Sequence, residues 1–283
     1  MKLIADGGST KTEWCLCNEG RLIKRVFTGG MNPYILDNNE ILNLLRTSLL
    51  PQLGDAVVSE IHYYGAGCRD AVIPSVRNLL AEVFTLAAGR ISVHSDMLAS
   101  ARALFGSEPG IACILGTGSN SCYYDGNKIA DAVPPLGYIL GDEGSGAHIG
   151  KSLVNAILKR RMPQSVADKF VKETNLTADE VIRRVYRESE PGRFLASLTH
   201  FVADNICHKE ISSMVTSCFR SFFKNNVSAY GIKECRIAAM GSVAFYFSGL
   251  LKEAASQEGY VLDKIIKSPM EGLLIYHGVK EEL

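Results

Sequence analysis

Near its amino terminus the chain reads Asp6-Gly7-Gly8-Ser9-Thr10-Lys11-Thr12, between short apolar runs at residues 2–5 and 13–17. Two apolar runs joined by a turn rich in Gly, Ser and Thr predict a β-hairpin. The tip of such a hairpin exposes consecutive backbone N–H groups and hydroxyls, which together can bind phosphate. The alternative is an ordinary structural hairpin, because Gly pairs are common turn formers.

The same arrangement recurs later in the chain. An apolar run at 111–115 leads into a second turn, Gly116-Thr117-Gly118-Ser119-Asn120, and further strands are predicted at 121–124 and 128–133. A strand, a Gly/Ser turn and two more strands is also the order at residues 3–27. This repeat indicates two related domains, and we expect the two turns to line one cleft.

The remaining segments predict alternating helices and strands. The first 105 residues read βββαβαβα, which is typical of an α/β layer architecture. Apolar spacing predicts helices at 40–50 (ending near Pro51), 72–86, 97–105, 145–159, 165–173, 177–188, 192–206, 209–229, 243–256 and 270–283. Further strands are expected at 60–64, 90–94, 235–240 and 260–266.

Composition excludes several classes of protein. The 283 residues carry 30 basic and 30 acidic side chains, so neither nucleic acid nor an anionic membrane is an expected partner. We expect no signal peptide, because no positively charged segment followed by an apolar run opens the sequence, and no membrane span, because no apolar stretch reaches roughly 18 residues. Its eight cysteines are scattered without C-x-x-C pairs, which favours free core thiols in a reducing cytoplasm.

Three motifs resemble those of a known superfamily. The stretch at 6–12, the turn at 116–120 and the late strand–Gly241-Ser242–helix are similar to the two phosphate loops and the adenosine loop of the sugar kinase–heat-shock chaperone–actin superfamily. Within it, Ser95-Asp96 and Gly141-Asp142-Glu143-Gly144-Ser145 resemble the N-acetylglucosamine kinase branch. That branch is grouped with the BadF-BadG-BcrA-BcrD ATPases.

The resemblance implies an α/β fold of two ribonuclease-H-like (actin-like ATPase) domains, with a nucleotide and sugar cleft between them. We place the amino-terminal domain at 1–107 and the carboxy-terminal domain at 108–269, with a helical insertion at 160–230. The helix at 270–283 is expected to pack back on the first domain.

The resemblance also implies ATP and Mg²⁺ as cofactors. Asp6 would hold Mg²⁺ through water, because this ion keeps most of its hydration; the alternative for Asp6 is a turn-capping side chain. Lys11 could be an exposed hairpin lysine without a function. The residues assigned to ATP are Gly7, Gly8, Ser9, Thr10, Lys11, Thr12, Gly116, Thr117, Gly118, Gly241 and Ser242.

Asp96 lies between a predicted strand and a predicted helix. The resemblance implies that it is the general base for the sugar 6-hydroxyl, which has to come within about 3 Å of the carboxylate. Asp is also a preferred helix N-cap, which is the alternative role. Asp142 and Glu143 could likewise cap the following helix. The residues assigned to the sugar are Asn32, Gly67, Ser119, Asn120 and Asp142.

These assignments predict an ATP-dependent phosphotransferase for the 6-hydroxyl of an amino sugar, with N-acetylglucosamine as the first candidate. Its expected partners are ATP and the sugar, and the resemblance implies a homodimer. One alternative is a kinase for glucosamine or another hexose. Others are a BadF-type ATPase that activates a redox partner, which would need paired cysteines for an iron–sulfur cluster, and a non-catalytic nucleotide or sugar sensor.

Overall fold

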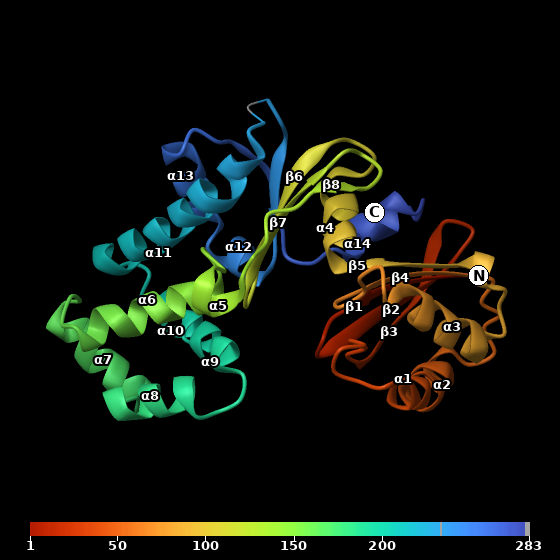
Figure 1. Ribbon diagram of the computed structural model, residues 1–283, viewed down its shortest axis with the longest axis horizontal. Helices are drawn as coiled ribbons and strands as arrows, with labels where there is room; N and C mark the ends of the chain where they lie inside the picture. The colour runs from red at the N-terminus through yellow and green to blue at the C-terminus, as the bar shows by residue number, and fades with distance from the viewer. Residues whose placement is uncertain (233, 281–283) are drawn as a thin grey trace. The chain divides into compact units, whose positions relative to one another are not determined.

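A computed structural model describes residues 1–232 and 234–280 of the chain (Figure 1). The chain forms two compact units. The first unit contains Met1–Glu108, Gly126–Lys128 and the segment from Pro269 onwards, and the second contains Pro109–Asp125 and Ile129–Ser268. The carboxy-terminal segment therefore folds with the amino-terminal half of the chain.

The first unit is built on a five-stranded sheet with the order β3-β2-β1-β4-β5. β1 is antiparallel to β2 and parallel to β4, and the turn at 8–10 joins β1 to β2. The strands are β1 (Lys2–Gly7), β2 (Lys11–Asn18), β3 (Arg21–Gly29), β4 (Glu60–Gly65) and β5 (Ile91–Ser95).

Successive residues of a strand point to opposite faces of its sheet. Both faces of this sheet therefore carry apolar side chains, and helices cover both. Leu3 and Ala5 of β1 belong to the core beneath α1 (Asn38–Leu44) and α3 (Ile73–Phe84). The opposite face carries α4 (Asp96–Phe105) and α14 (Met270–Tyr276), both in contact with β1. Asp6 lies on this second face, so the sheet directs its carboxylate toward the side of α4.

The second unit repeats the sheet, with the order β10-β9-β6-β7-β8. Its strands are β6 (Gly110–Leu115), β7 (Ser119–Tyr124), β8 (Ile129–Asp131), β9 (Ile237–Met240) and β10 (Leu262–Ile266). Its helices are α5 (Gly137–Leu140), α6 (Gly146–Leu158), α7 (Gln164–Thr174), α8 (Ala178–Tyr186), α9 (Pro191–Ser197), α10 (Thr199–Asp204), α11 (Lys209–Phe222), α12 (Ser242–Tyr246) and α13 (Ser248–Gln257). β6 and β7 in this unit correspond to β1 and β2 in the first.

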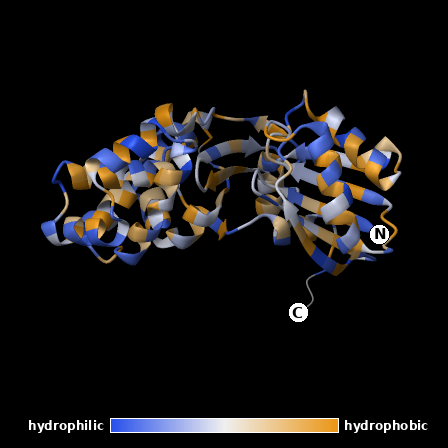
Figure 2. Ribbon diagram, turned by 90° about the horizontal axis from the view of Figure 1, so that it is seen from below, coloured by the Kyte–Doolittle hydropathy of each residue, from blue (hydrophilic) through white to orange (hydrophobic). Residues whose placement is uncertain are grey.

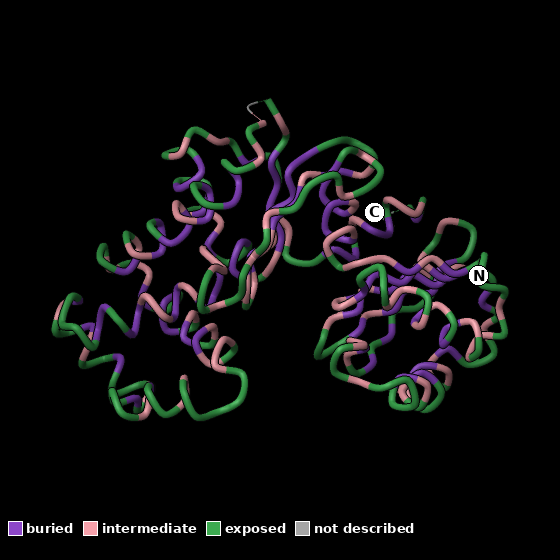
Figure 3. The backbone as a smooth tube through the Cα atoms, viewed as in Figure 1, coloured by how far each residue is buried: buried purple, intermediate pink, exposed green. Residues whose placement is uncertain are grey.

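Each unit has its own apolar core: its central strands are largely purple, that is buried, in Figure 3, and orange apolar residues alternate with blue polar ones along its helices in Figure 2. Trp14 is fully buried, and its indole N–H donates to the Thr28 hydroxyl at 3.0 Å. Six of the cysteines are buried and free, while Cys207 is exposed and Cys235 is half-buried. Among the described residues, no helix is both long and apolar enough to cross a bilayer.

Several predicted helices have different bounds in the structure. The segment 192–206 is two helices, α9 and α10, and 243–256 is also two, α12 and α13, which meet at Phe247. Phe247 has φ −106° and ψ 26°, outside helical geometry, and side-chain periodicity does not register one such residue. The segment 209–229 is α11 followed by a π-helical turn (Phe223–Val227) and a 3₁₀ turn (Ser228–Tyr230).

The prediction that the first helix stops near Pro51 is wrong. A π-helical turn at Leu45–Leu49 follows α1 and resets the hydrogen bonding, so Pro51 falls in the first turn of α2 (Leu50–Leu53). The missing N–H of proline costs little at that position. The final helix, predicted at 270–283, ends at Tyr276, and residues 281–283 lie outside the described residues.

Candidate active site

The β1–β2 turn is a tight hairpin tip. The Gly8 N–H donates to the Lys11 carbonyl at 2.9 Å, which leaves Ser9 and Thr10 exposed at the tip. Gly30 packs against this tip: its N–H donates to the Thr10 carbonyl at 2.9 Å, and a Cβ at Gly30 would lie 2.2 Å from the Ser9 carbonyl oxygen. The backbone at Gly30 therefore supports the turn at a distance that only glycine permits.

Two other residues assigned to ATP are placed differently from Ser9 and Thr10. Thr12 is fully buried on β2. The Lys11 ammonium lies 4.2 Å from the centroid of the Phe27 ring on β3, a cation–π contact. Gly7 is covered by the Tyr63 ring, whose hydroxyl donates to the Met31 carbonyl at 3.1 Å. Of this stretch, the tip residues are the ones best placed to meet a phosphate.

Asp6 is the last residue but one of β1 and lies directly opposite Glu13 on β2. Burial raises the pKa of Asp6 to about 7, and the nearby carboxylates of Glu13 and Asp96 add to the shift while Lys11 opposes it. Glu13 is paired with Arg25 at 2.9 Å, so it is already neutralised. Asp6 is thus a recessed carboxylate that lacks a counter-cation of comparable strength.

This donor set suits Mg²⁺, which prefers carboxylate oxygens and usually takes only one or two of them, completing its shell with water and substrate phosphates. In the part of the chain that the structure describes, no group of three or more His, Cys, Asp and Glu side chains could hold a metal by itself. Asp6 therefore fits the ion as a partner of a nucleotide, and it does not form a preassembled protein cage.

Asp96 is the first residue of α4, but it does not cap the helix. The N-cap is Ser95, whose hydroxyl accepts the Leu98 N–H at 3.3 Å. One Asp96 carboxylate oxygen accepts the Met97 N–H at 2.9 Å, which orients the group. The protein around it raises the pKa of Asp96, chiefly by desolvation, and the Met97 N–H and Arg69 oppose that shift. Asp96 is left as an oriented, strengthened base.

Asn32 joins two loops of the first unit. Its amide donates to the Ser9 hydroxyl at 2.8 Å, and its carbonyl oxygen accepts the Tyr34 N–H at 3.0 Å. Gly67 sits against the same side chain, since a Cβ there would lie 2.4 Å from the Asn32 oxygen. The structure thus brings Asn32 and Gly67 together with the tip of the first turn, although they are far apart in sequence.

In the second unit, Asp142 lies against the second turn. One of its oxygens accepts the Ser119 N–H at 3.3 Å, and a Cβ at Gly118 would lie 3.1 Å from the other. Burial raises the pKa of Asp142, and the Ser119 N–H opposes the shift. The amides of Gly146 and Ala147, at the start of α6, hold the Gly116 and Thr117 carbonyls at 2.8 and 3.1 Å. The turn is therefore fixed from two sides.

Neither acidic residue of the 141–145 loop caps α6. The cap is Ser145, whose hydroxyl accepts the His148 N–H at 3.1 Å. Glu143 instead accepts the side-chain amides of Asn225 and Asn226 at 2.9 and 3.3 Å, which helps to lower its pKa. Asn120 is half-buried at the edge of the turn, and Ser119 is buried. Asn120 and Asp142 are the more accessible of the sugar candidates in this unit.

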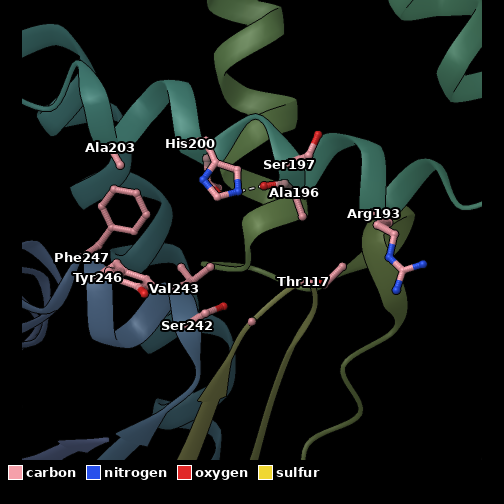
Figure 4. A pocket seen from close by; sticks show the side chains of 12 residues that line it. Thr117, Arg193, Ala196, Ser197, His200, Ala203, Ser242, Val243, Tyr246 and Phe247 are labelled. Atoms are coloured by element: carbon pink, nitrogen blue, oxygen red, sulfur yellow. Dashed lines mark hydrogen bonds between the residues drawn. The ribbon is translucent and has the colours of Figure 1, made fainter. Parts of the chain in front are cut away.

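A cavity of about 490 Å³ opens beside the second turn (Figure 4). Gly116, Thr117 and Ser242 line it, so three of the residues assigned to ATP share one cavity. Gly241, just before Ser242, has φ 119°, and a Cβ there would lie 2.2 Å from the Leu115 carbonyl oxygen. Glycine at 241 lets β9 pass close to β6 and brings Ser242 to the cavity.

The other walls of this cavity were not predicted. They come from α9, α10, α12 and the residue that follows α12: Arg193, Ala196, Ser197, Thr199, His200, Ala203, Val243, Tyr246 and Phe247. In Figure 4, His200 and Phe247 point into the space above Thr117 and Ser242. The sequence carries no signal for these helical residues, because their spacing is that of ordinary amphipathic helices and only the packing of α9 and α10 places them here.

Comparison with known proteins agrees with this arrangement. No protein-family model and no curated protein matches the sequence. A solved structure from Porphyromonas gingivalis, assigned as an N-acetylglucosamine kinase, is 42% identical, covers 98% of this chain and 99% of its own, and has a TM-score of 0.92. This chain belongs to the N-acetylglucosamine kinase family.

More distant structures share the fold of this family. One is a protein from Chromobacterium violaceum with the same assignment, 19% identical, covering 97% of this chain and 98% of its own, with a TM-score of 0.72. Another is a ROK-family glucokinase from Streptomyces griseus in complex with glucose and AMPPNP, 14% identical, covering 98% and 97%, with a TM-score of 0.56. The two ribonuclease-H-like domains expected from the sequence are thus confirmed as the fold.

Proposed function

We propose that the protein is an ATP-dependent sugar kinase that transfers the γ-phosphoryl group to the 6-hydroxyl of an amino sugar, with N-acetylglucosamine as the acceptor. The observation that carries the proposal is the placement of Asp96. Its carboxylate is oriented by the Met97 N–H and lies near Asp6, and Ser95 rather than Asp96 caps the helix. The 42% identity to an assigned N-acetylglucosamine kinase over nearly the whole chain supports the same reading.

Asp96 is the proposed general base. The Met97 N–H holds one carboxylate oxygen, and the other accepts the proton of the sugar 6-hydroxyl as that oxygen attacks the γ-phosphorus. The raised pKa of Asp96 makes it a better proton acceptor than an exposed aspartate. The phosphorus–oxygen bond to ADP breaks as the bond to the sugar oxygen forms, and ADP leaves.

Asp6 would hold Mg²⁺, which when bound neutralises charge on the β- and γ-phosphates. Asp6 has to be ionised for this role. Because the carboxylates of Glu13 and Asp96 lie near it, a bound dication would offset the repulsion between these negative charges. Ser9 and Thr10 at the exposed tip of the first turn would donate hydrogen bonds to phosphate oxygens, while the Gly8 N–H closes the turn through its bond to the Lys11 carbonyl.

The second unit would bind the rest of the nucleotide. Gly116, Thr117 and Gly118 form the second phosphate turn, and the adenosine group would enter the cavity above Thr117 and Ser242. Val243 and Phe247 give the cavity an apolar part of its wall, which suits a purine ring. The proposed sugar contacts are Asn32 and Gly67 of the first unit, and Ser119, Asn120 and Asp142 of the second.

The direct test is a coupled assay of ADP release with Mg-ATP and four acceptors: N-acetylglucosamine, glucosamine, glucose and N-acetylmannosamine. We expect the highest kcat/KM with N-acetylglucosamine and formation of the 6-phosphate by NMR. Preference for another sugar would correct the acceptor and keep the kinase. No sugar-stimulated ADP release with any of them would overturn the proposed function.

A further inference from the structure

The second unit contains a second cavity that shares no lining residue with the nucleotide cavity. It has a volume of about 620 Å³ and lies between α6 and α11, and we call it the α6–α11 groove. Small-molecule sites typically have volumes of roughly 300–1,000 Å³. The groove is thus large enough for a metabolite, and none of the residues proposed for ATP, Mg²⁺ or sugar lies in it.

Two cations face the groove without a carboxylate partner. Among the described residues, no Asp or Glu oxygen lies within 4.0 Å of the Lys151 ammonium or of the Arg161 guanidinium. Lys151 donates to the Tyr138 carbonyl at 3.0 Å, and Arg161 donates to the Asn155 side chain at 2.5 Å. Both therefore keep donors for an anion. Glu210 is the one carboxylate among the lining residues.

Serine hydroxyls also line the groove. Ser213, Ser217 and Ser221 are spaced four residues apart on one side of α11, and Ser152 of α6 also lines the groove. Ser221 donates to the Ser217 carbonyl at 3.1 Å, whereas Ser213 and Ser217 make no side-chain hydrogen bond within the described residues. The hydroxyls of Ser213 and Ser217, in a groove that two cations also line, match a ligand that carries both a phosphate and hydroxyl groups.

The groove is physically joined to the loop that carries Asp142. His148 lines the groove, and its Nδ1 accepts the Gly144 N–H at 3.0 Å, so in neutral His148 the remaining N–H, at Nε2, is free to donate. Lys151 donates to the carbonyl of Tyr138 in α5, the helix that precedes this loop. Two lining residues thus fix the segment 138–144 on both sides of Asp142.

We propose that the α6–α11 groove is a second binding site, for a small phosphate ester that bears hydroxyl groups, such as a sugar phosphate. The guanidinium of Arg161 and the ammonium of Lys151 would bind the phosphate, since charge-assisted and bidentate contacts suit its oxygens. The serines would bind the hydroxyls. A ligand that draws Lys151 toward itself weakens its bond to Tyr138, so occupancy of the groove changes the position of Asp142 and with it the KM for the sugar.

The effect on KM rests on the proposed function, but binding in the groove does not. Isothermal titration calorimetry would compare three probes: glucose 6-phosphate, inorganic phosphate and glucose. The variants are Arg161→Met, which removes one cation, and Ser217→Leu, which fills the groove without changing charge. Arg160→Met is the matched control, because Arg160 is exposed and does not line the groove.

We expect glucose 6-phosphate to bind the wild type and the control equally and to bind Arg161→Met and Ser217→Leu about tenfold or more weakly, since a hydrogen bond to a charged group is worth roughly that factor. Glucose 6-phosphate should bind more tightly than inorganic phosphate if the serines contribute, and glucose alone should not bind there. Equal affinity in all four proteins, or no binding to the wild type at millimolar concentration, would overturn the proposal. Preference for inorganic phosphate would reassign the site to a simple anion.

Kinetic measurements distinguish the proposed groove from the proposed kinase function. In the presence of glucose 6-phosphate, the KM for the sugar should shift in the wild type and in Arg160→Met, and should not shift in Ser217→Leu. An unchanged KM in the wild type would remove the regulatory effect and leave the binding result standing. An enzyme with no kinase activity would sink the proposed function, while the calorimetry would still decide the groove.

Discussion

Asp6 and Glu13 lie directly opposite each other across the β1–β2 hairpin, and the proximity of Glu13 adds to the burial that raises the pKa of Asp6 to about 7. Arg25 neutralises Glu13 at 2.9 Å, whereas Asp6 has no ion pair among the described residues. The uncompensated charge is therefore on Asp6, where a bound dication would remove it.

Metal binding should depend on pH through Asp6. Below about pH 7 most of Asp6 is protonated, so it has to release a proton before Mg²⁺ binds. We expect Mg²⁺ affinity in the presence of nucleotide to rise through pH 7 and then level off. Calorimetry in two buffers of different ionisation enthalpy would measure the proton release. Asp6→Asn should bind the metal weakly and show no such pH dependence; the same dependence in that variant would place the titrating group elsewhere.

Replacing the proposed base should remove chemistry and keep binding. Asp96→Asn preserves shape and the Met97 N–H contact but cannot take the sugar proton, so kcat should fall by about 10²–10⁴. Nucleotide affinity, measured by calorimetry without sugar, should stay within about twofold of the wild type, because a twofold change is only a few tenths of a kcal/mol. Asp70→Asn, the same change at an exposed aspartate of the same unit, is the control. Turnover near the wild-type rate in Asp96→Asn would take Asp96 out of the mechanism.

Gly30 should be essential to the first phosphate turn. Gly30→Ala puts a methyl group 2.2 Å from the Ser9 carbonyl oxygen, and the backbone has to move to relieve the contact. We expect a loss of about 1–3 kcal/mol in the free energy of unfolding, as for other overpacked sites, and a raised KM for ATP. Gly89→Ala is the matched control, since a Cβ at Gly89 meets no atom within 4 Å. Equal stability and KM in the two variants would show that the turn does not need Gly30.

A cluster of histidines should make the first unit less stable in acid. Burial lowers the pKa of His277 to about 3 and that of His94 to about 4, and it also lowers the pKa of His62. Each folded-state pKa lies below the unfolded value of about 6.5, so the unfolded chain binds more protons and stability falls as the pH drops below about 6.5.

His277 offers a way to isolate this effect from the opposite contribution of Asp6, whose raised pKa favours the folded state in acid. Its Nε2 lies 2.9 Å from the Tyr64 hydroxyl, and its ring stacks on His62 at 4.0 Å. Urea unfolding of the wild type and of His277→Gln should give curves of stability against pH whose slopes differ between pH 6.5 and 4 by up to about 1.4 kcal/mol per pH unit, one proton. Parallel curves would show that His277 has the same pKa in the folded and the unfolded chain.

Local chemistry accounts for what could be predicted at the candidate site. The first turn is a hairpin because glycines and short polar residues separate two apolar runs. The similar turn at 116–120 indicated correctly that the second unit repeats the same pair of strands. The order of strands and helices follows from apolar periodicity in the same way. The roles of capping residues were harder to assign, because Ser95 precedes Asp96 and Ser145 follows Glu143, and composition does not say which polar side chain takes the helix N–H.

By itself, the sequence determined the two Gly/Ser turns, the α/β class and the family, because turn formation and strand alternation depend on neighbours in the chain. Only the tertiary structure decided which of those residues are accessible to a ligand. Thr12 is buried, and the ammonium of Lys11 lies over the Phe27 ring. Asp6 lies beside Glu13 across the hairpin. The tertiary structure also decided the walls of the nucleotide cavity, where His200 of α10 and Phe247 beyond α12 meet from separate segments. Burial and long-range packing set these contacts, and neither is written in the spacing of residues along the chain.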